Sequence, residues 1–198
     1  MVNMVKRFIF VLCLIVLIFL VGCGPSEQAE KTNQIVVEEE FLEIEGELSE
    51  FMLQIEDFSD DWKLSQQAPR SKSDISEKSL KLGWTDGYSR TFDSWEIITV
   101  EHFISRYSVD DIDKFRNHVN RDSGEGYTFE VLPNINLGDH SVSYKVTEEI
   151  SLGELTLENE AYWIIFQKGN LHETLILSGS KLDYEFLKDL AKVAESKV

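Results

Sequence analysis

No cysteine follows residue 23 in this chain of 198 residues, whose two cysteines, Cys13 and Cys23, both lie near its start. The rest of the chain therefore has no disulfide framework, no cysteine-based zinc site and no thiol nucleophile. A hydrophobic core must hold it together, and about 165 residues are enough for one domain of ordinary size. The fold must therefore be sought in hydrophobic periodicity, and any chemistry in other side chains.

The first residues have the composition of an export signal. Lys6-Arg7 precede an unbroken apolar run of 14 residues from Phe8 to Val21, and the small residue Gly22 follows it. A positive start, an apolar stretch and a small residue at the cleavage point are the parts of a secretory signal. The run is shorter than the ~20 residues that a helix needs to cross a bilayer, so we expect cleavage rather than a permanent transmembrane helix.

The segment Leu20-Val21-Gly22-Cys23 resembles the lipobox of prokaryotic lipoproteins. The resemblance implies that residues 1–22 are a lipoprotein signal peptide and that a diacylglyceryl group modifies the Cys23 thiol. It also implies a lipid-anchored protein on the extracytoplasmic face of a cell membrane. Two or more acyl chains give lasting attachment, because each buried methylene contributes about 0.8 kcal/mol. The alternative is an ordinary signal-anchor in which Cys23 is incidental.

The charge of the chain excludes several classes of partner. It has 36 acidic and 19 basic side chains, a formal charge of −17. Phosphate binding needs clustered Lys and Arg, so nucleic acid is not an expected partner. Anionic lipid headgroups would also repel the domain. We expect the polar residues 23–34 to act as a flexible tether and residues 35–198 to form a single domain.

Three segments have the periodicity of helices. Apolar residues recur at steps of three and four from Val37 to Ile55, although Gly46 and repulsion between glutamates weaken that prediction. A second helix is expected after Ser108, with Asp111 completing a capping box. A third is expected after Ser180 as its cap, and its apolar side would consist of Tyr184, Leu187, Leu190, Ala191 and Ala194.

The remaining segments favour strands. β-branched and aromatic residues predict strands at 62–65, 87–92, 96–107, 127–132, 140–148, 155–166 and 171–178, and residues 66–79 predict an exposed loop. Gly169-Asn170 is suited to a two-residue hairpin turn. Short connections imply antiparallel pairing. The predicted fold class is therefore α+β, a largely antiparallel sheet of about five to seven strands with helices packed on it.

Roughly residues 85–198 carry a second resemblance. The segments are EHFISRYSVDDIDKFRNHV, LGDHSV, IIFQKGNLHETLILSG and LKDLAKVAESKV. In this order they resemble a layout of prokaryotic surface lipoproteins and the PsbP/Mog1-type α+β sandwich. The resemblance implies a strand, a helix, a Gly-Asp turn, a long hairpin turning at Lys-Gly-Asn, and a closing helix. PsbP-like proteins are mostly non-catalytic accessory or interaction modules, which favours a binding role by analogy.

The sequence contains no complete motif for catalysis, a metal or a cofactor, and we expect none of the three. His172-Glu173 begins a zinc-protease motif, but Ile176 occupies the place of the second histidine. Ser178 and Lys181 have the spacing of a serine–lysine pair without its companion motifs, so a turn and helix cap are expected instead. Two acidic clusters could offer oxygens to calcium but lack the rest of a calcium loop: Asp57, Asp60 and Asp61, and Asp110, Asp111 and Asp113.

Trp84 and Tyr88 are the candidate ligand contacts. Asp86-Gly87 lies between them, and a turn there would present both rings on a loop. The alternative is that these rings belong to the hydrophobic core and its rim.

The leading functional hypothesis is a membrane-anchored surface lipoprotein whose non-catalytic domain binds a protein or another extracellular ligand. The rival is a lipid-anchored hydrolase or carbohydrate-active enzyme, whose paired carboxylates are set by spatial rather than sequence spacing. A solute-binding receptor is disfavoured, because such receptors are usually larger and two-lobed.

Overall fold

The computed structural model describes residues 42–109, 127–152 and 155–198, which belong to one compact unit, Glu40–Val198. Seven strands form one sheet in the order β1-β2-β3-β7-β6-β5-β4, and each neighbouring pair is antiparallel. The predicted antiparallel sheet is confirmed, and strand predominates over helix in the described residues. The strands are β1 Trp62–Pro69, β2 Trp84–Ser94, β3 Ile98–Tyr107, β4 Tyr127–Val131, β5 His140–Leu152, β6 Leu155–Lys168 and β7 Leu171–Gly179.

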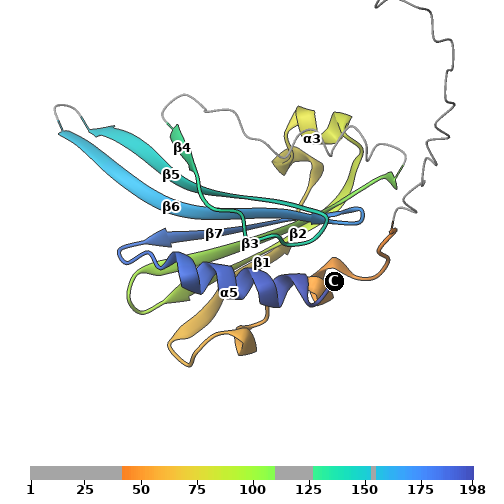
Figure 1. Cartoon of the computed structure of the whole chain (residues 1–198), viewed down its shortest axis with the longest axis horizontal. Coiled ribbons are helices and arrows are strands. Elements are labelled where there is room, and N and C mark those ends of the chain that lie inside the picture. Colours follow the sequence, from red (N-terminus) through yellow and green to blue (C-terminus); the bar gives the residue numbers. More distant parts are fainter. Residues whose placement is uncertain (1–41, 110–126, 153–154) are drawn as a thin grey trace, which may run out of the picture. The chain divides into compact units, whose positions relative to one another are not determined.

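Helices lie on both faces of the sheet. On one side, which we call the α5 face, α5 (Tyr184–Glu195) packs against Val100 and Leu175 (Figure 1). The opposite side, the α3 face, carries the short helix α3 (Glu77–Lys81) at one end. There Trp84 and Tyr107 form a small buried cluster with the residues that flank α3, Ile75 and Leu82. The two faces are therefore covered to different extents by the described helices.

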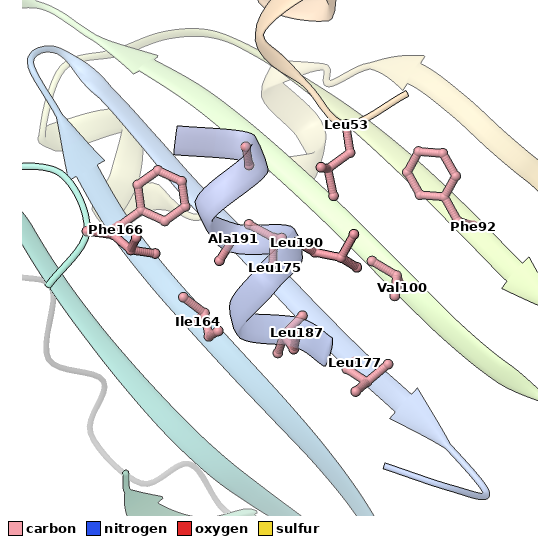
Figure 2. Close-up of a cluster of buried hydrophobic side chains, with 12 residues drawn as sticks. Leu53, Phe92, Val100, Ile164, Phe166, Leu175, Leu177, Leu187, Leu190 and Ala191 are labelled. Carbon is pink, nitrogen blue, oxygen red and sulfur yellow. The ribbon is translucent and has the colours of Figure 1, made fainter. Parts of the chain in front are cut away.

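The main hydrophobic core lies on the α5 face. Figure 2 shows side chains of the strands meeting those of α5, and each of the buried members is at most 4% exposed. Every second residue of a strand points to the same side, so one alternating apolar row per strand builds this core. Burying a large apolar side chain contributes roughly 1.5–3 kcal/mol. The labelled members are Leu53, Phe92, Val100, Ile164, Phe166, Leu175, Leu177, Leu187, Leu190 and Ala191.

Helix α5 confirms the closing helix, with a correction to its cap. The carboxylate of Asp183, not Ser180, accepts hydrogen bonds from the backbone N–H groups of Glu185 (2.9 Å) and Phe186 (3.3 Å). Ser180 instead donates to the Glu96 carbonyl oxygen, 2.8 Å away. The residues of the predicted apolar side that become buried are Leu187, Leu190, Ala191 and Ala194.

The helix predicted from Val37 to Ile55 is wrong over its described part. Only α2 (Leu48–Phe51) and the 3₁₀ turn η1 (Ile55–Asp57) are helical there. Gly46 has a φ of 121°, which no helix accommodates. The apolar residues face the sheet as predicted, but irregular backbone carries them, and residues 37–41 lie outside the described part of the chain.

Two other predicted boundaries differ. Strand β1 continues to Pro69, and the rest of the predicted loop contains the 3₁₀ turn η2 (Lys72–Asp74) and α3. Ser76 caps α3 by accepting a hydrogen bond from the Ser79 N–H at 3.1 Å. The serines that indicated a loop therefore act as caps of short helices. The helix predicted after Ser108 falls largely on residues 110–126, outside the described residues.

The β6–β7 hairpin has the predicted turn. Lys168 pairs with Leu171 around Gly169-Asn170. The Asn170 side-chain oxygen accepts a hydrogen bond from the Ile44 N–H at 2.9 Å, which fixes the start of the described chain at this end of the sheet. Beside the turn, Gly138 has a φ of 53°, and a Cβ there would lie 2.1 Å from the Gln167 carbonyl oxygen. Glycine is therefore required in the predicted Gly-Asp turn.

We expect Gly138→Ala to lower the free energy of unfolding by about 2 kcal/mol or more, because it combines left-handed backbone with a clash against a carbonyl group. Urea denaturation of the full chain measures this change. Asn136→Gly is the matched control, since Asn136 has a φ of 52° and is exposed. It should alter stability by less than about 0.5 kcal/mol. Equal effects of the two substitutions would contradict the close approach at Gly138.

Candidate functional site

A hollow of about 350 Å³ lies on the α3 face of the sheet. This volume is near the lower end of the range for small-molecule sites, roughly 300–1,000 Å³. Its walls come from the strands β2, β3, β6 and β7 and from residues 70–79, which include η2 and the first part of α3. The side chains that define its chemistry are Arg70, Asp74, Ser76, Ser79, Trp84, Phe103, Ser105, Tyr107, Trp163, His172 and Thr174.

The floor of the hollow consists of side chains from β3 and β7, because successive side chains of a strand point to opposite faces of the sheet. In β3, the odd-numbered Phe103, Ser105 and Tyr107 face this side, and in β7 His172 and Thr174 pair beside them. The Tyr107 and His172 rings meet edge to face at a centroid distance of 6.3 Å. The floor therefore carries aromatic rings with hydroxyl groups between them, which suits a planar ligand that has polar groups.

Arg70 supplies the cation of the hollow and is its only lysine or arginine among the described residues. The half-buried guanidinium donates to Ser105 Oγ at 3.2 Å, and its carbon lies 5.3 Å from the centre of the Phe103 ring. Burial lowers the pKa of Arg70 below its ordinary value, while Tyr107 and Asp74 act in the opposite direction. An arginine remains charged despite such a shift, and its partial desolvation strengthens attraction to an anion.

The carboxylate of Asp74 has a local structural role at the rim. It accepts hydrogen bonds from Ser71 Oγ at 2.8 Å and from the Ser71 N–H at 3.0 Å, which closes the capping box of η2. These bonds from Ser71 are the main cause of a lowered pKa of Asp74. The carboxylate is thus held ionised in a turn that positions the start of α3. It is poorly placed to act as a general acid.

The structure separates the two predicted ligand contacts. Trp84 is buried and lines the hollow, whereas Tyr88 packs on the α5 face with the Leu48 cluster. The turn predicted at Asp86-Gly87 is wrong, because both residues lie within β2. An irregular step between Trp84 and Asp86 in the pairing with β3 reverses the side to which Trp84 points. Ligand contact by either ring stays a prediction, and only Trp84 lies at the hollow.

A buried histidine–glutamate pair lies on the opposite, α5 face. His102 Nε2 is 2.7 Å from Glu173 Oε2, and the two side chains are 0% and 1% exposed. The Leu53 N–H donates to His102 Nδ1 at 3.1 Å, so Nδ1 carries no proton and Nε2 is the donor to Glu173. Arg90 Nη1 donates to the Leu53 carbonyl oxygen at 2.8 Å. These residues bind the segment around Leu53 and are inaccessible to a substrate.

This buried network was missed by motif searching, but its signal is present in the sequence. Glu173 occupies an apolar row of β7 with Leu171 and Leu175, and His102 occupies such a row of β3. A polar residue in an apolar row indicates a buried hydrogen-bonding partner. His172 and Glu173, adjacent in the sequence, point to opposite faces, so they do not form one site.

The described residues contain no group of three or more His, Cys, Asp or Glu side chains that could hold a metal. Within the same part of the chain, no helix is long and apolar enough to cross a membrane. Lys181 of the predicted serine–lysine spacing pairs with Glu96 at 3.3 Å. Asp57 pairs with Lys197 at 3.0 Å. The second acidic cluster, which begins at Asp110, and the predicted lipidation site, Cys23, lie outside the described residues.

Substitution of Glu173 tests the role of the buried pair. Glu173→Gln keeps an oxygen acceptor for His102 Nε2–H, so the free energy of unfolding should stay within about 1 kcal/mol of the wild type. Glu173→Leu leaves the N–H without its acceptor and should cost about 1–3 kcal/mol. Urea denaturation of both variants decides the question. If glutamine is as destabilising as leucine, the hydrogen bond is not what holds the pair.

Known proteins give no family assignment for this chain. No protein-family model and no curated protein matches the chain. Among solved structures, it is similar to the extracellular domain of PknH from Mycobacterium tuberculosis, with 12% sequence identity and a TM-score of 0.46 over 76% of this chain and 91% of that chain. A likeness this weak assigns neither a fold family nor an activity. The lipobox and the PsbP/Mog1 resemblance stay predictions, and function must be argued from the residues.

Proposed function

We propose that the protein is an extracytoplasmic lipoprotein, attached to a membrane through Cys23, whose domain binds a small anionic ligand at the hollow on the α3 face. The PsbP/Mog1-type α+β architecture is part of this proposal. The leader and the segment Leu20-Val21-Gly22-Cys23 support the anchor. The observation that carries the binding role is the half-buried Arg70 guanidinium, which lies among aromatic walls and is fixed by Ser105.

Binding accounts for these residues better than hydrolysis. Glycoside hydrolysis needs two carboxyl groups about 5–10 Å apart on either side of the scissile bond. Asp74 is the only carboxylate among the described residues lining the hollow, and Ser71 already holds it. The buried pair His102 and Glu173 has the chemistry of an acid–base dyad but no exposure. A base must reach the proton that it removes, so this pair favours no catalytic role.

The ligand class follows from the lining. One guanidinium favours a single carboxylate or similar anion, to which it can donate two parallel hydrogen bonds. The rings of Phe103 and Trp84 favour a flat apolar body beside that anion. Benzoate has both features and serves as the probe, and benzyl alcohol is its uncharged counterpart.

The anchor is tested by Cys23→Ser. Cells that express the wild-type chain and are fed labelled palmitate should incorporate the label into it, and the variant should incorporate none, because the acceptor thiol is absent. The variant should also be released or remain as an unprocessed precursor. Cys13→Ser is the matched control and should behave as wild type, since Cys13 lies inside the apolar run. Unchanged labelling of Cys23→Ser would refute the anchor.

The hollow is tested by benzoate binding to the full chain in detergent micelles. We expect benzoate to shift the indole N–H resonance of Trp84, assigned with Trp84→Phe, with a dissociation constant on the order of 1 mM for so small a ligand. Arg70→Met should weaken binding at least tenfold. Lys78→Gln, which removes an exposed charge of α3 outside the hollow, should change it little. Equal shifts with benzyl alcohol, or unaltered affinity in Arg70→Met, would overturn the anionic specificity.

A further inference from the structure

The β2–β3 turn exposes two large apolar side chains. Trp95 is 81% and Ile97 79% exposed, the highest values for large hydrophobic residues in the described part of the chain. Glu96 lies between them, and we call Trp95, Glu96 and Ile97 the tip. Single exposed apolar residues are common on proteins, but two on one three-residue turn form a local apolar projection.

The backbone of the tip is strained at its apolar residue. Ile97 has a φ of 60°, and the only other described non-glycine residue with positive φ is Asn136. Asparagine adopts this conformation readily, but a β-branched residue there is a rare outlier. Strain of this kind persists only where surrounding contacts fix the backbone, and it is often associated with function. An isoleucine thus occupies a backbone conformation in which asparagine or glycine would be relaxed.

Hydrogen bonds from the end of β7 fix the tip. The Ser180 N–H donates to the Ile97 carbonyl oxygen at 3.2 Å, and Ser180 Oγ donates to the Glu96 carbonyl oxygen at 2.8 Å. Lys181 pairs with the Glu96 carboxylate at 3.3 Å. Gly179 lies so close that a Cβ there would be 2.2 Å from the Ile97 carbonyl oxygen. The two apolar side chains are therefore presented by a preorganised turn, which reduces the entropy lost on binding.

We propose that Trp95 and Ile97 insert into the interfacial layer of the lipid bilayer that carries the anchor. The proposal rests on the anchor inferred above. Tryptophan is enriched at membrane–water interfaces, where its ring is buried and its N–H stays near water. The anchor keeps the tip at a high effective concentration near the bilayer, so a weak contact is enough.

The size of the tip favours a lipid surface over a protein partner. Two side chains of this kind expose on the order of 300 Å², whereas a stable protein interface buries ~800 Å² on each partner. Two lysines accompany the acidic side chains near the tip, which include Asp61 and Asp183 beside Glu96. Lys181 neutralises Glu96, and Lys63 Nζ lies 6.0 Å from the centre of the Trp95 ring. Zwitterionic headgroups therefore suit the tip, and anionic lipid weakens the contact by repelling the rest of the domain.

The tip and the start of the described chain lie at opposite ends of the sheet. The tip adjoins Gly179 at the end of β7, and Ile44 is bound to Asn170 at its start (Figure 1). The nine residues of β7 span about 30 Å. The tip therefore lies about 30 Å from the point at which the described chain begins.

Fluorescence quenching by lipid tests the insertion. The full chain is reconstituted into phosphatidylcholine vesicles with or without bromine-labelled acyl chains, and the emission of Trp95→Phe is subtracted from that of the wild type. We expect the difference emission, which reports Trp95, to be blue-shifted and at least twofold weaker with brominated lipid. If brominated lipid leaves it unchanged while aqueous acrylamide quenches it, the tip faces water and the proposal fails.

Ile97→Asn is the second variant, because asparagine relaxes the backbone and preserves the turn while the apolar side chain is lost. It should be at least as stable as the wild type and should reduce the quenching by lipid several-fold; undiminished quenching would overturn the role of Ile97. Val131→Asn removes an apolar side chain that is 69% exposed on β4 and should have no effect on the quenching.

Mass spectrometry of the peptide that contains Cys23 shows separately whether the lipid is present. A chain that lacks lipid but keeps its apolar leader attaches to vesicles through that leader, so the quenching of such a precursor still reports the tip.

Discussion

Both backbone groups of Leu53 are bound by buried side chains of the sheet, and this contact determines how the α5 face is closed. His102 accepts from the Leu53 N–H, and Arg90 donates to its carbonyl oxygen. Irregular backbone can cross a core only if its polar groups find partners. With those partners in place, the Leu53 side chain joins the same cluster as Leu187 of α5. Glu173 then completes the network by accepting from the histidine, which leaves no part of it available for chemistry.

The α5 face is covered by α5 and the segment around Leu53, whereas side chains of the α3 face line the hollow. On the α3 face, polar and apolar side chains alternate within the same strands, so carboxyl, hydroxyl and aromatic groups lie together. Burial is the main cause of a raised pKa of Glu101, and repulsion from Asp93 adds to it. Arg70 is desolvated on this face as well. Groups that are partly desolvated on a surface with hollows are typical of binding sites, whereas the fully sealed pair on the α5 face is typical of a structural network.

The sequence predicted elements governed by local rules and missed those governed by distant contacts. Alternation and turn chemistry were sufficient for the hairpin at Gly169-Asn170, and helical periodicity was sufficient for α5. The segment before Leu53 has helical spacing, but its backbone is bound by side chains about 40 or more residues away, which no local pattern reveals. The same limit applies to the site. The sequence predicts a ligand contact at Trp84, which lines the hollow, whereas Arg70 reaches the hollow only because β3 brings Ser105 and Phe103 beside it. The irregular step that separates Trp84 from Tyr88 is likewise a property of strand pairing.

Departures from local rules are nevertheless informative, and each has a different physical reason here. Glu173 breaks the apolar row of β7 because a histidine across the ladder needs an acceptor. Gly138 occupies left-handed backbone because a carbonyl group leaves no room for a side chain. Ile97 occupies similar backbone with a side chain that no internal contact requires, since it is 79% exposed. The first two departures are explained within the fold. The third has no such explanation among the described residues, and strain without internal benefit indicates a contact outside the molecule.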